Sequence, residues 1–71
     1  SHEVDLVDAL PIEVKYVGSV TEKDAVGLRA CMRACSFRNG LLLTKDKEDV
    51  WRVPEGKITL IPVWRFLLKG A

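Results

Sequence analysis

The sequence has few of the residues that build covalent or metal-held frameworks: two cysteines, one histidine and three prolines in 71 residues. Cys31 and Cys35 lie four residues apart, a spacing that in a helix shares one face but holds the side chains poorly for a disulfide. A zinc site needs about four ligands, and the lone histidine, His2, stands near the start of the chain. We therefore expect both cysteines to be small buried apolar residues in a reducing compartment.

Long apolar runs and an excess of charge are also missing. No apolar segment reaches the ~18 residues expected of a membrane-spanning helix, and no signal peptide is visible. Eleven Lys and Arg residues balance ten Asp and Glu residues, for a formal net charge of +1. This balance excludes a broad electrostatic attraction to nucleic acid or anionic membrane, so DNA binding would need a local patch. We expect a cytoplasmic protein without membrane partners.

The composition is typical of a folded domain, with 48% hydrophobic and 30% charged residues. A chain of 71 residues makes one domain at most, so we expect residues 1–71 to form a single domain. Residues 1–2 resemble a cloning remnant, and a strand is predicted directly after them. We therefore expect a fragment of a longer protein.

Alternation of polar and apolar residues predicts strands at 3–7 and 12–17, joined around Pro11 as an antiparallel hairpin. Since one face of a hairpin must be buried, its apolar side chains are expected to point inward. This inward set is Val4, Leu6, Ile12, Val14 and Tyr16. The charged side chains then share the opposite face.

On that opposite face, the hairpin register would place Asp5 across from Glu13, and Glu3 across from Lys15. Two facing carboxylates repel each other, and a divalent cation between them reverses that energy. Mg²⁺ and Mn²⁺ favour carboxylate and carbonyl oxygens, and Lys15 could orient or deprotonate a metal-bound water. The other interpretation is a solvated surface hairpin in which Glu3 and Lys15 form a cross-strand pair.

A helix is predicted over about residues 21–37, with Thr21 as N-cap, Asp24 as its capping-box partner and Asn39-Gly40 as the stop. Its inward stripe is expected to comprise Ala25, Leu28, Cys31, Met32 and Cys35. Arg29 and Arg33 lie towards the other side. They could touch a nucleic-acid backbone or simply form a solvated helix face.

The apolar run 41–44 predicts a strand covered on both faces. Strands at 50–53 and 57–61 flank Pro54-Glu55-Gly56 as a second hairpin, and Pro62 can open a final helix. The resulting order is ββα-β-ββ-α, an α/β (α+β) domain with a small mixed sheet of about five strands. No glycine-rich phosphate loop is present, so we expect no ATP site in this chain.

Glu3-Val4-Asp5, then Pro11-Ile12-Glu13-Val14-Lys15-Tyr16, a helix and another strand resemble the partial core of the PD-(D/E)xK, restriction-endonuclease-like superfamily. With residues 40–46 and 58–64, these stretches also resemble the C-terminal region of a family of archaeal and bacterial ATPases of largely unknown role. Across that superfamily a helix and a strand usually precede the Asp strand, and an acid from that helix would be missing here unless Glu3 replaces it.

The resemblance implies that Asp5, Glu13 and the Val14 carbonyl bind Mg²⁺ or Mn²⁺, with Lys15 as the catalytic lysine. The expected activity is metal-dependent phosphodiester hydrolysis, in a domain attached to its parent ATPase. The sequence does not name the nucleic-acid substrate, and DNA is the partner considered. The alternative is a non-catalytic module that docks onto that ATPase or dimerises through the apolar segment Val63–Leu68. Simple packing of that segment over the sheet is the third interpretation.

Overall fold

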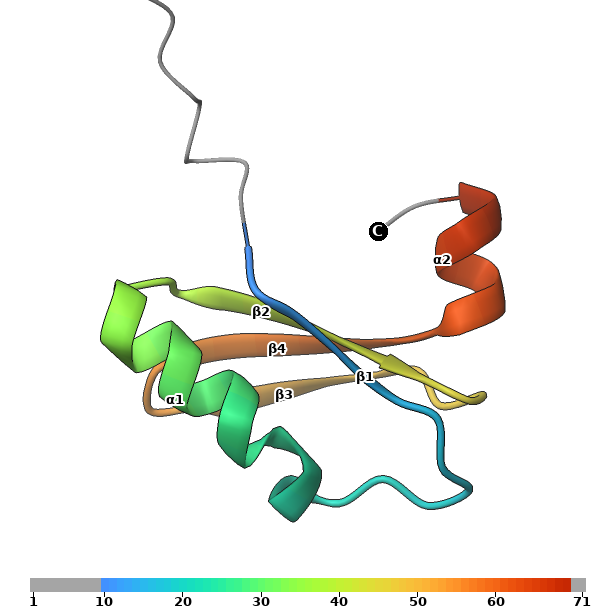
Figure 1. Ribbon diagram of the computed structural model, residues 1–71, viewed down its shortest axis with the longest axis horizontal. Coiled ribbons are helices and arrows are strands. Elements are labelled where there is room, and N and C mark those ends of the chain that lie inside the picture. The colour runs from blue at the N-terminus through green and yellow to red at the C-terminus, as the bar shows by residue number, and fades with distance from the viewer. Residues whose placement is uncertain (1–9, 70–71) are drawn as a thin grey trace, which may run out of the picture.

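The computed structural model of the chain describes residues 10–69. Figure 1 shows the arrangement of its strands and helices. The elements are β1 (Ile12–Lys15), the 3₁₀ turn η2 (Glu22–Ala25), α1 (Val26–Cys35), β2 (Asn39–Thr44), β3 (Asp49–Val53), β4 (Gly56–Pro62) and α2 (Val63–Lys69).

The strands form one mixed four-stranded sheet in the order β1-β2-β4-β3. Strand β2 pairs in parallel with both β1 and β4, and β3 pairs antiparallel with β4 (Figure 1). The predicted mixed α+β class and the second hairpin are therefore confirmed. The predicted fifth strand, residues 3–7, lies outside the described residues.

Strand β2 is covered on both faces, as its continuous apolar run predicts, and residues 40–44 are all buried. Leu42 packs towards α1 in a cluster with Leu28 and Met32. On the other face, Leu41 and Leu43 pack with Ile61 and the α2 residues. The sheet therefore has two small hydrophobic cores, one on each face.

The start of the helical segment is as predicted, and its end is not. The Thr21 N–H donates to Asp24 Oδ2 at 2.9 Å, which closes the first turn of η2. The helix α1 stops at Cys35 because Ser36 adopts a left-handed conformation, with φ 61°. The predicted stop at Asn39-Gly40 is wrong, since these residues begin β2.

Gly40 serves helix packing instead of helix termination. A Cβ atom there would lie 2.9 Å from Met32 Sδ and 3.3 Å from Leu28 side-chain carbons. The glycine therefore lets α1 pack directly on β2.

The inward stripe of α1 is narrower than predicted. Ala25, Leu28 and Met32 are buried, but Cys31 and Cys35 are exposed, so the expectation of buried cysteines is wrong. The sheet contacts α1 on one side only, which leaves the flank of the stripe and the last turn in solvent.

The predicted inward face of β1 is also wrong. Ile12, Val14 and Tyr16 are 49%, 56% and 64% exposed. Their partners in β2 set this outcome, because Glu13 is in register with Leu42, whose side chain points towards α1. The charged side chains of β1 therefore face α1, and its apolar side chains face the opposite side of the sheet.

Helix α2 begins one residue after Pro62, which is the last residue of β4. Val63 and Phe66 pack against the sheet, whereas Trp64, Leu67 and Leu68 are 57%, 76% and 77% exposed. Neither helix in the described range 10–69 has the length and apolar character needed to span a bilayer.

The turn between β3 and β4 depends on Gly56. Its φ is +149°, and a Cβ there would lie 2.0 Å from the Arg38 carbonyl oxygen, which accepts a hydrogen bond from the Lys57 N–H. We expect Gly56→Ala to lower the free energy of unfolding by about 1–3 kcal/mol, measured by urea denaturation. Gly18→Ala is the control, since a Cβ at Gly18 meets nothing within 4 Å. Equal denaturation midpoints for the two variants would contradict this role.

Candidate functional site

Glu13 and Lys15 form a charged pair on β1. They are two residues apart, so their side chains share one face of the strand. Lys15 Nζ lies 3.8 Å from Glu13 Oε2, and the two side chains are 38% and 30% exposed, respectively. The two groups lie next to each other on the face of the sheet that α1 covers.

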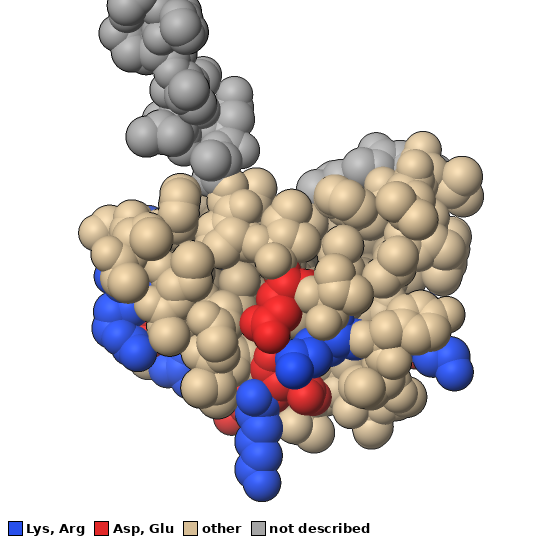
Figure 2. Space-filling model, viewed as in Figure 1, with Lys and Arg blue, Asp and Glu red and all other residues tan. Residues whose placement is uncertain are grey.

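Gly27 of α1 lies directly beside this pair. A Cβ at Gly27 would be 3.6 Å and 3.9 Å from the two carboxylate oxygens of Glu13. The glycine thus leaves room for the carboxylate between helix and strand. Figure 2 shows acidic and basic atoms next to one another near the middle of the viewed face. The Glu13 side chain is 30% exposed, so a small ligand could reach its carboxylate.

Of the other two predicted site residues, Val14 lies within the described part of the chain and Asp5 does not. Asp5 lies outside the described residues, so its position relative to Glu13 stays a prediction. Val14 lies on β1 between Glu13 and Lys15, with its side chain on the opposite face. Across residues 10–69, no three His, Cys, Asp or Glu side chains cluster closely enough to hold a metal ion. Any metal site built on Glu13 therefore needs further ligands such as Asp5.

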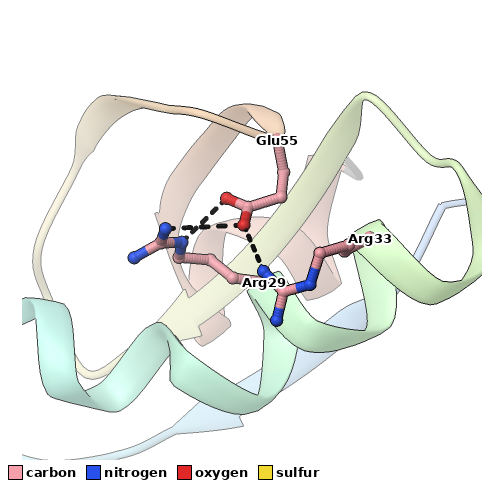
Figure 3. A network of polar contacts seen from close by, with 3 residues as sticks. All are labelled: Arg29, Arg33 and Glu55. Atoms are coloured by element: carbon pink, nitrogen blue, oxygen red, sulfur yellow. Dashed lines mark hydrogen bonds and ion pairs between the residues drawn. The ribbon is translucent and has the colours of Figure 1, made fainter.

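A second charged group joins α1 to the β3–β4 turn, and Figure 3 shows its three residues. Arg29 Nε donates to Glu55 Oε1 at 2.8 Å, and its Nη2 approaches Oε2 at 3.4 Å. Arg33 Nη1 donates to Glu55 Oε2 at 2.6 Å. The Glu55 side chain is only 8% exposed, so its carboxylate is held almost entirely by these guanidinium groups.

The hydrogen bond from Arg29 lowers the pKa of Glu55 from its ordinary value, against the opposing effect of burial. The same bond raises the pKa of Arg29. The sequence predicts that Arg29 and Arg33 either contact nucleic acid or form a solvated helix face. In the structure, both side chains bind the Glu55 carboxylate. No local sequence pattern signals this contact, because Glu55 lies 26 and 22 residues from the two arginines.

No protein-family model, curated protein or solved structure matches the chain.

The Glu55 contacts predict a specific acid response. A lowered pKa contributes stability above the ordinary glutamate pKa, about 4.3, and this contribution is lost as the pH falls through the lowered value. We expect Glu55→Gln to melt at a lower temperature than the wild type at pH 7, with the gap narrowing below about pH 4.3. Thermal unfolding followed by circular dichroism measures both.

Glu48→Gln is the matched control, because Glu48 pairs with Arg65 at 2.9 Å on an exposed part of the surface. An exposed ion pair contributes little to stability. The melting temperatures of Glu48→Gln and the wild type should therefore differ little at every pH. A difference in melting temperature between Glu55→Gln and the wild type that stays constant from pH 7 to pH 3 would show that the carboxylate charge does not stabilise the fold.

Proposed function

We propose that the chain is a nuclease-like domain of the PD-(D/E)xK type, attached to a cytoplasmic ATPase, in which Glu13 helps to bind Mg²⁺ or Mn²⁺. The observation that supports this most is the placement of Glu13 and Lys15 side by side on the face of β1 that meets α1, where both side chains remain partly exposed. A carboxylate and an ammonium group at this distance suit a metal ligand and a group that orients an attacking water.

The surrounding topology supports the proposal. The Glu-x-Lys strand β1 leads through α1 to the parallel strand β2, which is buried from Gly40 to Thr44. This strand–helix–strand order is the one that the resemblance implies. A parallel pair covered by a helix is also a rigid support, which a metal ligand needs.

Asp5 is the proposed second ligand. Among the described strands, β1 has β2 as its one neighbour, so its other edge is unpaired within residues 10–69. We propose that residues 3–7 pair there, with the Asp5 side chain on the Glu13 face. The Val14 carbonyl completes the proposed ligand set.

A second candidate function, docking onto the parent ATPase or onto a second copy, has its own support. Ile12 and Val14 are exposed beside Leu41 and Leu43, their register partners on the face that α2 partly covers. The exposed side chains of α2 add to this apolar surface, and Figure 2 shows the region over α2 as largely uncharged.

Metal binding tests the first candidate. Adding Mn²⁺ to isotope-labelled chain 1–71 is expected to broaden the amide signals of Asp5, Glu13 and Val14 at millimolar metal or below, because the ion is paramagnetic and bound nearby. Glu13→Gln should abolish this broadening. Glu48→Gln, which removes an exposed carboxylate elsewhere, should leave it unchanged.

Cleavage is the next readout. If the wild type cleaves DNA with Mn²⁺, Glu13→Ala and Lys15→Ala should each lower the rate by about 100-fold or more. Equal rates in the wild type and Glu13→Ala would mark the cleavage as contamination. Absence of metal-dependent broadening at Glu13 would remove the nuclease proposal itself.

Self-association tests the second candidate. If α2 mediates dimerisation, the sedimentation coefficient should rise with concentration, and the Leu67→Ser, Leu68→Ser variant should stay monomeric. Val26→Ser is the control, since Val26 is an exposed apolar residue on α1. A wild type that is monomeric at every concentration leaves only the ATPase as a docking partner.

A further inference from the structure

A hollow of about 390 Å³ opens beside the β3–β4 turn, and its charged lining is entirely basic. The basic side chains are Arg38, Arg52 and Lys57. The remaining lining residues are Asn39, Val53, Pro54 and Gly56. The three cations thus border one hollow that holds no acidic group.

The backbone fixes these cations next to one another. Arg52 and Lys57 are direct register partners across the antiparallel β3–β4 ladder. The Lys57 N–H donates to the Arg38 carbonyl oxygen at 2.9 Å, and Gly56 leaves the space for that approach. Like charges directly opposite each other in a β-ladder repel. This arrangement therefore destabilises the fold unless an anion binds between the two side chains.

The rest of the described chain does not neutralise them. Ion pairs within residues 10–69 join Lys15 to Glu13, Arg29 and Arg33 to Glu55, and Arg65 to Glu48. The acid nearest in sequence to this hollow, Glu55, is already held by two arginines. Within residues 10–69, the cations of this hollow are therefore left uncompensated.

We propose that this hollow binds a phosphate group of a nucleic-acid backbone. Guanidinium groups match phosphate oxygens in pairs, and a lysine adds a point charge. The hollow has no aromatic lining for base stacking, so the contact would position the polymer without reading its sequence. The choice of a nucleic acid as the bearer of the phosphate rests on the proposed nuclease-like function.

The hollow is separate from the Glu13–Lys15 pair. It borders β2 at Asn39, whereas Glu13, the proposed metal ligand, is in register with Leu42 of that strand. Three residues along the strand separate these positions, roughly 10 Å at 3.3 Å per residue. The hollow therefore anchors the backbone at a distance from the proposed metal site.

The test is binding of a fluorescein-labelled duplex DNA, measured by anisotropy in EDTA at a series of salt concentrations. The Arg38→Gln, Arg52→Gln, Lys57→Gln variant is compared with Lys23→Gln, Lys45→Gln, Lys47→Gln, which removes the same charge from exposed positions elsewhere. Each lost phosphate contact lowers the slope of log affinity against log salt by about 0.9. We expect the first variant to lose about 0.9 units of slope, as one phosphate contact requires, and at least about tenfold in affinity at low salt, whereas the control loses less than about half of each.

Equal losses in the two variants, or no duplex binding by the wild type, would overturn the proposal. Competition by inorganic phosphate at millimolar concentration supports a phosphate site. Binding to phosphatidylserine vesicles that the first variant loses, with duplex binding unchanged, would overturn the nucleic-acid assignment. Because EDTA keeps divalent metal out, this result is independent of whether Glu13 binds Mn²⁺.

Loss of folding is excluded by thermal unfolding of the same variants. Removing the Arg52–Lys57 repulsion should leave the first variant at least as stable as the wild type at low salt. If the triple variant is unfolded, Arg52→Gln alone is measured in the same assay, and an unchanged salt slope there overturns the proposal.

Discussion

Strand β2 has hydrogen-bonded neighbours on both sides and hydrophobic coverage on both faces. A strand in this position satisfies its backbone groups only through pairing, so its partners are held in one register. The pairing of β1 with β2 sets which face of β1 meets α1. The contact of α1 at Gly40 and the packing of α2 on Leu41 and Leu43 follow from the same strand. The position of the candidate site is therefore a consequence of how β2 is buried.

Much of this arrangement is local and was predictable. The apolar run of β2, the β3–β4 hairpin around its Pro-Glu-Gly turn and the capping of η2 by Asp24 each follow from a few consecutive residues. The faces of β1 are different, because alternation defines two faces and only the partner strand decides which one is covered. The helix end was missed because Ser36, and not a glycine, takes the left-handed position.

Among the charged groups too, some contacts follow from local sequence and others depend on residues far apart in the chain. The neighbourhood of Glu13 and Lys15 follows from strand periodicity, whereas the Glu55 contacts join residues 26 and 22 positions apart. Such long-range contacts arise from packing the hairpin against α1, and no local pattern encodes them. The sequence did not predict the basic hollow, for a related reason. Net charge is summed over the whole chain, so a value near zero does not reveal acidic and basic groups that the fold places apart. One end of the sheet thus holds a compensated acid, and the hollow beside it holds uncompensated cations.

The orientation of β1 against α1 is the central claim, since the proposed metal site depends on it. Nuclear Overhauser effects in the isotope-labelled chain measure it directly. The structure predicts cross-peaks between the Glu13 side-chain protons and the Gly27 α-protons, with Ile12 and Val14 lacking contacts to Leu28 or Met32. Cross-peaks from Ile12 or Val14 to the α1 core, with none between Glu13 and Gly27, would contradict the account.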